Sequence, residues 1–167
     1  IRLLSGRRGY VMKHRSIPVL LAGLVLACGP VGPCPGGRLE GEVGPAVVSS
    51  WSFADDVETA ELETRPDSPL SVHTWFIALA DRLYVPTSTI RGPKDPTRRA
   101  WVEHVGRDPH VRIRLGEKIF ERRAARVVDA EEYARVRSAL EEKYGLDPSE
   151  RDPEREVWIY RLDARSS

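Results

Sequence analysis

The chain has 167 residues, 41% of them hydrophobic and 31% charged, which is the ordinary composition of one soluble globular domain with additional segments. Its net charge of +1 is uneven, because residues 1–27 hold five basic residues and no acidic one. The remainder has 21 basic against 25 acidic residues, a net charge of −4. A mildly acidic body of this kind gives no support for nucleic-acid binding.

The first segment has the features of an export signal. Basic residues follow Met12, the only methionine, and precede an apolar run from Ile17 to Ala27 that is too short to span a bilayer comfortably. This pattern predicts a signal peptide over residues 1–27. The run ends in Leu-Ala-Cys-Gly, which resembles the lipobox of bacterial lipoproteins. The resemblance implies a lipid on Cys28, a membrane anchor and a place in the cell envelope, facing the periplasm or the exterior. The alternative is an ordinary signal peptide with a chance cysteine.

Two further expectations concern the N-terminal part. We expect translation to begin at Met12; alternatively, Arg7-Arg8 belongs to a twin-arginine export motif, which serves folded, cofactor-loaded proteins. Residues 28–50 are rich in Gly and Pro and are predicted to form a flexible tether, in which Cys34 is an idle thiol. Residues 51–167 contain no cysteine, so this predicted domain uses neither a disulfide nor a cysteine-bound metal.

The body alternates short β patterns with two helical ones. We expect strands over 58–65 (a half-exposed edge strand), 71–79, 82–87, 111–115, 118–128 and 157–162, and helices over 97–105 and 130–144. Ala80-Asp81 and Gly116-Glu117 are predicted hairpin turns, and Asp95 and Asp129 are predicted N-caps. The fold class is therefore α+β, with a mostly antiparallel, barrel-like sheet and two flanking helices.

Three stretches of the body carry a family resemblance. The strand from Arg82 to Thr87 leads to a basic loop, then to Trp101 on a helix, then to Pro109 and Val111 at the start of a strand. This order resembles the split β-barrel flavin-binding superfamily, which includes pyridoxamine-phosphate-oxidase-like proteins and deazaflavin-dependent nitroreductases. The resemblance covers about residues 58–163. It implies a split barrel, FMN or a deazaflavin as cofactor, and a homodimer as one expected assembly.

The sequence departs from the family at two places. The Gly-Arg-x-Ser-Gly-Lys loop of the deazaflavin reductases is absent, and His104-Val105 stands where the family has Asn-Leu. The missing loop favours a second interpretation, in which the barrel is a non-catalytic module that binds a small molecule or an envelope partner.

The loop from Thr87 to Arg99 is the candidate cofactor site. Hydroxyls and cations at a strand end, beside a helix N-terminus, suit a phosphate group, and the family's flavin phosphate lies in about this place. The predicted cofactor-binding residues are Thr87, Ser88, Thr89, Lys94, Arg98, Arg99 and Trp101. The alternative is a solvated basic loop that pairs with the acidic stretch 55–63.

Other residue types give weaker indications. His73 and His104 are candidates for proton transfer, but isolated histidines are more often surface or core residues. Trp75, Trp101 and Trp158 could stack on a flavin, although tryptophan in strands is more often core. Arg112 and Arg114 share one strand face, expected to be solvated. No spacing indicates a metal site or a Ser-His-Asp triad. Together with the lipobox, the family resemblance implies a lipid-anchored oxidoreductase that passes a hydride to a small acceptor, such as a quinone or a nitroaromatic compound.

Overall fold

The computed structural model describes residues 36–165, so the predicted signal peptide, Cys28 and Cys34 lie outside the described residues. Within this range the chain forms eight strands and two α-helices, and the α+β class is confirmed. The strands are β1 (Glu42–Val43), β2 (Ala60–Thr64), β3 (Leu70–Thr74), β4 (Ile77–Leu79), β5 (Arg82–Pro86), β6 (His110–Leu115), β7 (Lys118–Arg126) and β8 (Ile159–Ala164). The helices are α1 (Ala100–Arg107) and α2 (Ala130–Tyr144).

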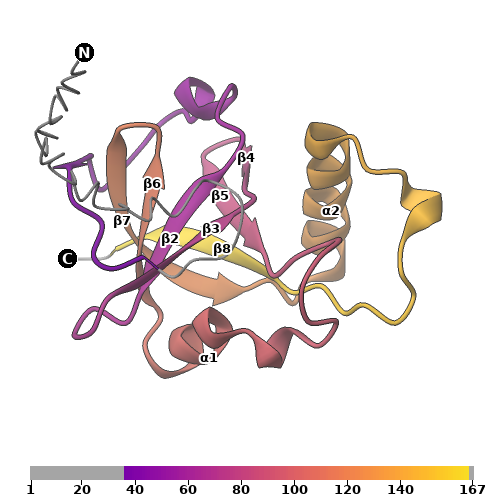
Figure 1. Ribbon diagram of the computed structural model, residues 1–167. Helices are drawn as coiled ribbons and strands as arrows, with labels where there is room; N and C mark the ends of the chain where they lie inside the picture. The colour runs from indigo at the N-terminus through magenta and orange to yellow at the C-terminus, as the bar shows by residue number, and fades with distance from the viewer. Residues whose placement is uncertain (1–35, 166–167) are drawn as a thin grey trace, which may run out of the picture. The chain divides into compact units, whose positions relative to one another are not determined.

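The strands make one curled sheet in the order β3-β2-β6-β7-β8-β5-β4, and every neighbouring pair on this path is antiparallel. The short β1 pairs parallel with β7. The path does not return to its start, so the barrel is open. Figure 1 shows α1 and α2 on different sides of the sheet, with the chain before β8 passing between them.

Strict alternation explains the hairpin of β6 and β7. Val111, Ile113 and Leu115 are buried in the main core cluster, while the residues between them point to the other face. Gly116 turns the chain with φ of 60°, a left-handed conformation that glycine adopts without strain. The predicted hairpin is confirmed.

Helix α2 begins and ends as its sequence predicts. The Asp129 carboxylate accepts a hydrogen bond from the Glu132 N–H at 2.7 Å, and Gly145 ends the helix in the left-handed region. Val136 and Leu140 pack into a second apolar cluster against the start of β8. The α2 face toward the sheet also carries Glu132, which accepts a hydrogen bond from the Tyr84 hydroxyl at 2.9 Å.

Three local predictions are wrong. Strand β2 is not an edge strand, because β3 and β6 pair with its two sides. The expected strand over 71–79 is two strands, since the chain leaves the sheet at Trp75-Phe76 and places Phe76 in the core. The expected helix over 97–105 is a short 3₁₀ turn, Pro96–Arg98, followed by α1; Asp95 caps the turn by accepting from the Thr97 N–H.

The expected tether is wrong for the part that the structure describes. The Gly36 N–H donates to the Ser71 carbonyl at 2.8 Å, Leu39 is buried, and β1 joins the sheet. Arg112 and Arg114 donate to the carbonyls of residues 39 and 40, each at 2.7 Å. Strand pairing and the two arginine side chains satisfy the hydrogen-bonding groups of this backbone. Its Gly and Pro content has no periodic pattern from which this pairing could be predicted. The face of Arg112 and Arg114 is consequently covered rather than solvated.

In residues 36–165 no helix is both long and apolar enough to cross a bilayer.

Candidate functional site

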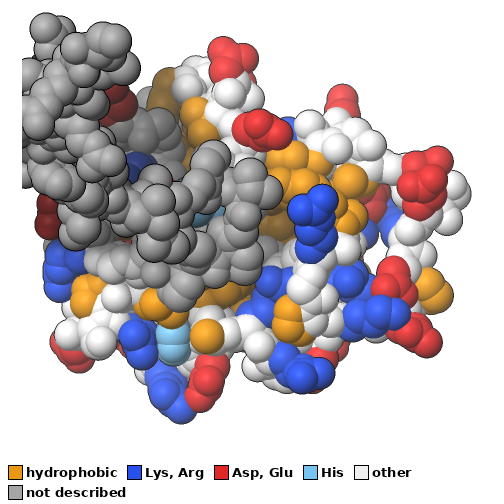
Figure 2. Space-filling view, in the orientation of Figure 1, with side chains coloured by type: hydrophobic (Ala, Val, Ile, Leu, Met, Phe, Trp, Pro, Cys, Tyr) orange, Lys and Arg blue, Asp and Glu red, His pale blue; other side chains and the backbone are white. Residues whose placement is uncertain are grey.

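The loop after β5 and the segment before β8 run side by side between the two helices (Figure 1). The Thr87 N–H donates to the Trp158 carbonyl at 2.8 Å, and the Glu156 N–H donates to the Lys94 carbonyl at 3.1 Å. The pairing of β5 with β8 therefore brings the predicted cofactor loop against residues 151–158. Figure 2 shows Lys and Arg side chains gathered on the surface in this region.

The three hydroxyl residues of the loop have different roles. Thr87 is buried, and its Oγ1 accepts from the Trp158 N–H at 3.0 Å, so it fastens the two segments together. Ser88 accepts from the Arg91 N–H at 3.1 Å and has φ of 155°, a conformation that is unusual for serine. Thr89 is buried, and its Oγ1 has no hydrogen-bond partner in the described part of the chain. Of the three hydroxyls, only that of Thr89 has no hydrogen bond in the described residues.

Two of the predicted cofactor-binding residues contact other parts of the protein instead. Lys94 lies 2.6 Å from a Glu154 carboxylate oxygen and 3.0 Å from one of Asp152. Hydrogen bonds to these two carboxylates raise the pKa of Lys94, and they occupy its charge. Trp101 is buried in the main core with its ring edge-on to Tyr160, so it is a packing residue and not a wall for a flavin. Arg98 is exposed.

Arg99 is the predicted residue whose setting best suits an anion. Its Nη2 donates to the Arg91 carbonyl at 2.6 Å, and its buried Nε has no partner among residues 36–165. The described residues place no carboxylate within 4.0 Å of it, unlike Lys94. Burial lowers the pKa of Arg99 from its ordinary value, and the positive charge of Arg155 lowers it further.

Arg155 is a functional candidate that the sequence analysis missed. Its side chain is 9% exposed, and its Nη1 lies 3.3 Å from each of the carbonyls of residues 91, 92 and 93. Its Nε is buried without a hydrogen bond; the nearest carboxylate oxygen is 4.0 Å away on Asp152, which is closer to Lys94. Arg99 and Arg155 thus share the Arg91 carbonyl as acceptor. Arg99 has no carboxylate within 4.0 Å among residues 36–165, and Arg155 has one only at 4.0 Å, on Asp152.

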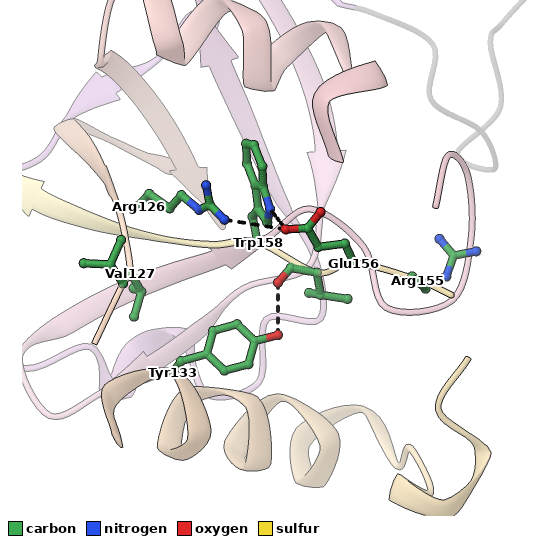
Figure 3. A pocket seen from close by; sticks show the side chains of 8 residues that line it. Arg126, Val127, Tyr133, Arg155, Glu156 and Trp158 are labelled. Carbon is green, nitrogen blue, oxygen red and sulfur yellow. Dashed lines mark hydrogen bonds and ion pairs between the residues drawn. The ribbon is translucent and has the colours of Figure 1, made fainter. Parts of the chain in front are cut away.

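Arg155 also borders a cavity of about 490 Å³, a typical size for a small-molecule site. Figure 3 shows Tyr133 on the α2 side of this cavity, Trp158 and Glu156 on the segment before β8, and Arg126 beside Trp158. The Arg126 guanidinium lies 3.6 Å from the centre of the Trp158 ring, and Trp158 Nε1 donates to Glu156. The lining combines aromatic and apolar groups with cations at both ends.

The remaining candidates lie elsewhere. His73 is exposed and lies 3.3 Å from a Glu61 oxygen. His104 is buried, with Nδ1 3.0 Å from the Thr64 hydroxyl. Trp75 stacks on Tyr144 with the ring centres 4.2 Å apart. Of the three tryptophans considered as stacking residues, only Trp158 lines the cavity. No group of three or more potential metal ligands occurs in the described residues.

No protein-family model matches the sequence, and no curated protein does. Solved structures do match. An F420-H2-dependent reductase matches with a TM-score of 0.52 and 16% identity, over 64% of this chain and 95% of that one. A candidate pyridoxamine 5′-phosphate oxidase from Listeria innocua gives 0.50 and 18%, over 69% and 90%. A structure described as a domain-swapped dimer gives 0.53 and 18%, over 65% and 81%.

These likenesses, together with the open antiparallel barrel, show that the chain has the same split-barrel fold as these structures. The fold that the sequence resemblance implied is confirmed. Identities of 16–18% carry the fold and not the activity.

Proposed function

We propose that the protein is a lipid-anchored oxidoreductase that binds FMN or a deazaflavin and reduces a small acceptor. The observation that carries the proposal is the pair Arg99 and Arg155, whose Nε atoms are buried without a hydrogen bond in the described residues; Arg155 also lines the cavity of about 490 Å³. Buried cations without anionic partners are costly in an apo protein, and a bound anion relieves that cost.

The residues suit the phosphate end of such a cofactor. Arginine forks bind phosphate through two parallel N–H donors. Thr89, on the same loop as Arg99, has a buried hydroxyl without a hydrogen-bond partner in the described residues. Asp152 and Glu154 lie within 3.0 Å of Lys94, and Glu156 lies 3.6 Å from Arg126. The pair therefore has only the 4.0 Å contact between Arg155 and Asp152 to balance its charge.

The cavity suits the ring end. Tyr133 is fixed by its hydroxyl, which donates to the Val157 carbonyl at 3.0 Å, and Trp158 is held by Arg126 on one face. When bound, a flavin or deazaflavin ring supplies the hydride chemistry, while these side chains bind and orient it and exclude water. The F420-dependent reductase among the structural matches supports the deazaflavin alternative.

The test compares phosphorylated and unphosphorylated ligands. Arg99→Ala should weaken FMN binding by about ten- to a hundredfold and riboflavin binding little, because one charge-assisted contact contributes about 1.5–3 kcal/mol. Arg98→Ala is the matched control, since this neighbouring arginine is exposed. Fluorescence titration of the full chain with FMN, riboflavin and a deazaflavin measures the affinities of the wild type and of both variants.

Two results would remove the proposal. Equal FMN affinity of wild type and Arg99→Ala would exclude the phosphate site. Failure of the wild type to bind any flavin or deazaflavin would leave the non-catalytic binding module, which the absent Gly-Arg-x-Ser-Gly-Lys loop already favours.

The anchor is a separate part of the proposal. Cys28→Ser should release the protein from membranes or leave it unprocessed, and mass spectrometry of the native protein should find acyl chains on Cys28. A mature-sized mutant that still sediments with membranes would contradict it. The domain-swapped dimer among the matches is consistent with a homodimer, which gel filtration of the released protein tests.

A further inference from the structure

A second cavity lies away from the proposed cofactor site, near the end of β8. Its volume is about 170 Å³, and it lies between the segment after β1, the start of β5 with the turn before it, and the paired strands β7 and β8. The apolar part of its lining consists of Ala46, Val47, Val48, Trp51, Leu162 and Ala164. The polar lining residues are Asp81, Arg82, Arg122 and Asp163.

Arg122 is the unusual member of this lining. It is 2% exposed and occupies a position on β7 between the core residues Phe120 and Ala124, where the strand pattern calls for an apolar side chain. Its guanidinium lies 5.2 Å from the centre of the Trp51 ring and 5.3 Å from that of Phe120, and Nη1 donates to the Glu121 carbonyl at 2.7 Å. In the described part of the chain no carboxylate lies within ion-pair distance of it.

Arginine is almost never fully buried unless it is paired. Two aromatic rings and one carbonyl compensate part of the Arg122 charge, but the other N–H groups of its guanidinium have no anionic partner in the described residues. Burial also lowers the pKa of Arg122. The other charged residues at the cavity already have ion-pair partners. Asp163 lies 2.8 Å from Arg161, and Arg82 lies between Asp81 and Glu132.

We propose that this cavity binds a small monocarboxylate, with the carboxylate on the Arg122 guanidinium and the apolar part against Val47, Val48 and Leu162. The volume equals that of about six water molecules in the liquid, which suits an acid of the size of butyrate or benzoate. Asp81 and Asp163 at the lining disfavour a second negative charge, so a dicarboxylate or phosphate should bind less well. This inference does not depend on the flavin proposal, because the two cavities share no lining residue.

Calorimetric titration of the full chain with benzoate and butyrate tests the site. The wild type should bind both at millimolar concentrations or below, and butyramide, the neutral analogue of butyrate, should bind at least about tenfold more weakly. Arg122→Met should lose at least tenfold in benzoate affinity. Arg123→Met is the matched control, since the neighbouring Arg123 is exposed and should leave binding unchanged.

A second pair of variants keeps the test decisive if Arg122→Met does not fold. Val47 lines the cavity and is 79% exposed, so its replacement does not disturb the core. Val47→Asp should weaken benzoate binding by repulsion, while Val47→Asn, with the same shape and no charge, should weaken it less. The proposal is overturned if the wild type binds no monocarboxylate, if butyramide binds as well as butyrate, or if Val47→Asp and Val47→Asn bind benzoate equally.

Discussion

Two groups of arginines in this molecule have opposite surroundings. On β6, Arg112 lies 3.2 Å from Glu63 and Arg114 lies 2.7 Å from Glu61, and both also donate to carbonyls of the segment before β1. Beside the β5 loop, Arg99 and Arg155 both donate to loop carbonyls. Arg99 has no carboxylate within 4.0 Å in the described residues, and the one near Arg155, on Asp152, is 4.0 Å away.

The difference separates arginines that hold the fold from arginines that are available to a ligand. The β6 pair fastens an N-terminal segment without periodic structure to the sheet, and the acidic partners come from the adjacent strand β2. The charges of Arg99 and Arg155 repel each other, and two such charges stay close only where the fold or a bound ligand compensates the repulsion. Mutations should therefore affect stability at the first group and ligand binding at the second.

The largest effect is expected at Glu63. Its side chain is 3% exposed, and Glu63→Ala leaves the Arg112 charge and the Leu39 N–H without their acceptor. Removing one partner of a buried ion pair destabilises by about 3–5 kcal/mol. Glu61→Ala is the control, because its partners are more exposed and its loss should amount to about 1 kcal/mol or less. Urea denaturation measures both; equal losses would mean that burial does not distinguish the two pairs.

The second effect concerns Arg99. Arg99→Met should leave the free energy of unfolding of the apo protein unchanged or raise it, because it removes a charge that has no anionic partner. FMN at a hundred times its Kd should stabilise the wild type by about 2.7 kcal/mol, and it should stabilise Arg99→Met far less at the same concentration. Thermal denaturation with and without FMN gives both values. If Arg99→Met unfolded as readily as Glu63→Ala, Arg99 would be a structural residue and the contrast between the two groups would fail.

The sequence predicts the parts that depend on local periodicity. The β6–β7 hairpin, the capped helix α2 and the basic loop follow from alternation, from Asp129 and from clustered cations. Pairing across the sheet does not follow from local pattern. Arg155 lies more than fifty residues from the loop that it contacts, and the neutralisation of Lys94 depends on Asp152 and Glu154, which the β5–β8 pairing brings near. Knowledge of that pairing would have indicated Arg155.

The same limit explains the errors near the N-terminus. Gly and Pro content predicts neither helix nor sheet for this stretch, yet Glu42–Val43 of its described part pair with β7. Such content says nothing about tertiary hydrogen-bond acceptors. Leu39 is buried because Arg112 and Glu63 bond its carbonyl and N–H, and both partners are distant in the sequence. The position of Trp101 in the core likewise reflects the packing of α1 against the barrel.

The third effect sharpens the description of the loop. Gly92 has φ of 76°, and a Cβ there would lie 2.7 Å from Arg99 Nη2. Gly92→Ala should therefore destabilise by about 1–2 kcal/mol through backbone strain and should also displace Arg99, weakening FMN. Gly106→Ala is the matched control, since it lies in α1 with open space around its Cβ position and should stabilise by about 0.5–1 kcal/mol. Unchanged FMN affinity in Gly92→Ala would show that Arg99 does not need this loop conformation.

The smallest effect is a pH dependence at His104 of α1, which belongs to neither arginine group. Burial, and to a lesser degree the charge of Arg65, lower the pKa of His104 below its ordinary value of about 6.5. The unfolded chain then binds the histidine proton more strongly than the folded chain, so stability is fully present above about pH 6.5 and falls as the pH drops toward the folded-state pKa. His104→Asn keeps a hydrogen-bonding group near the Thr64 hydroxyl and removes the titration. Urea denaturation below neutral pH measures the free energy of unfolding of the wild type and of His104→Asn. As the pH falls, the wild type should lose stability relative to His104→Asn. A constant difference over that range would mean that the neutral state of His104 contributes nothing to stability.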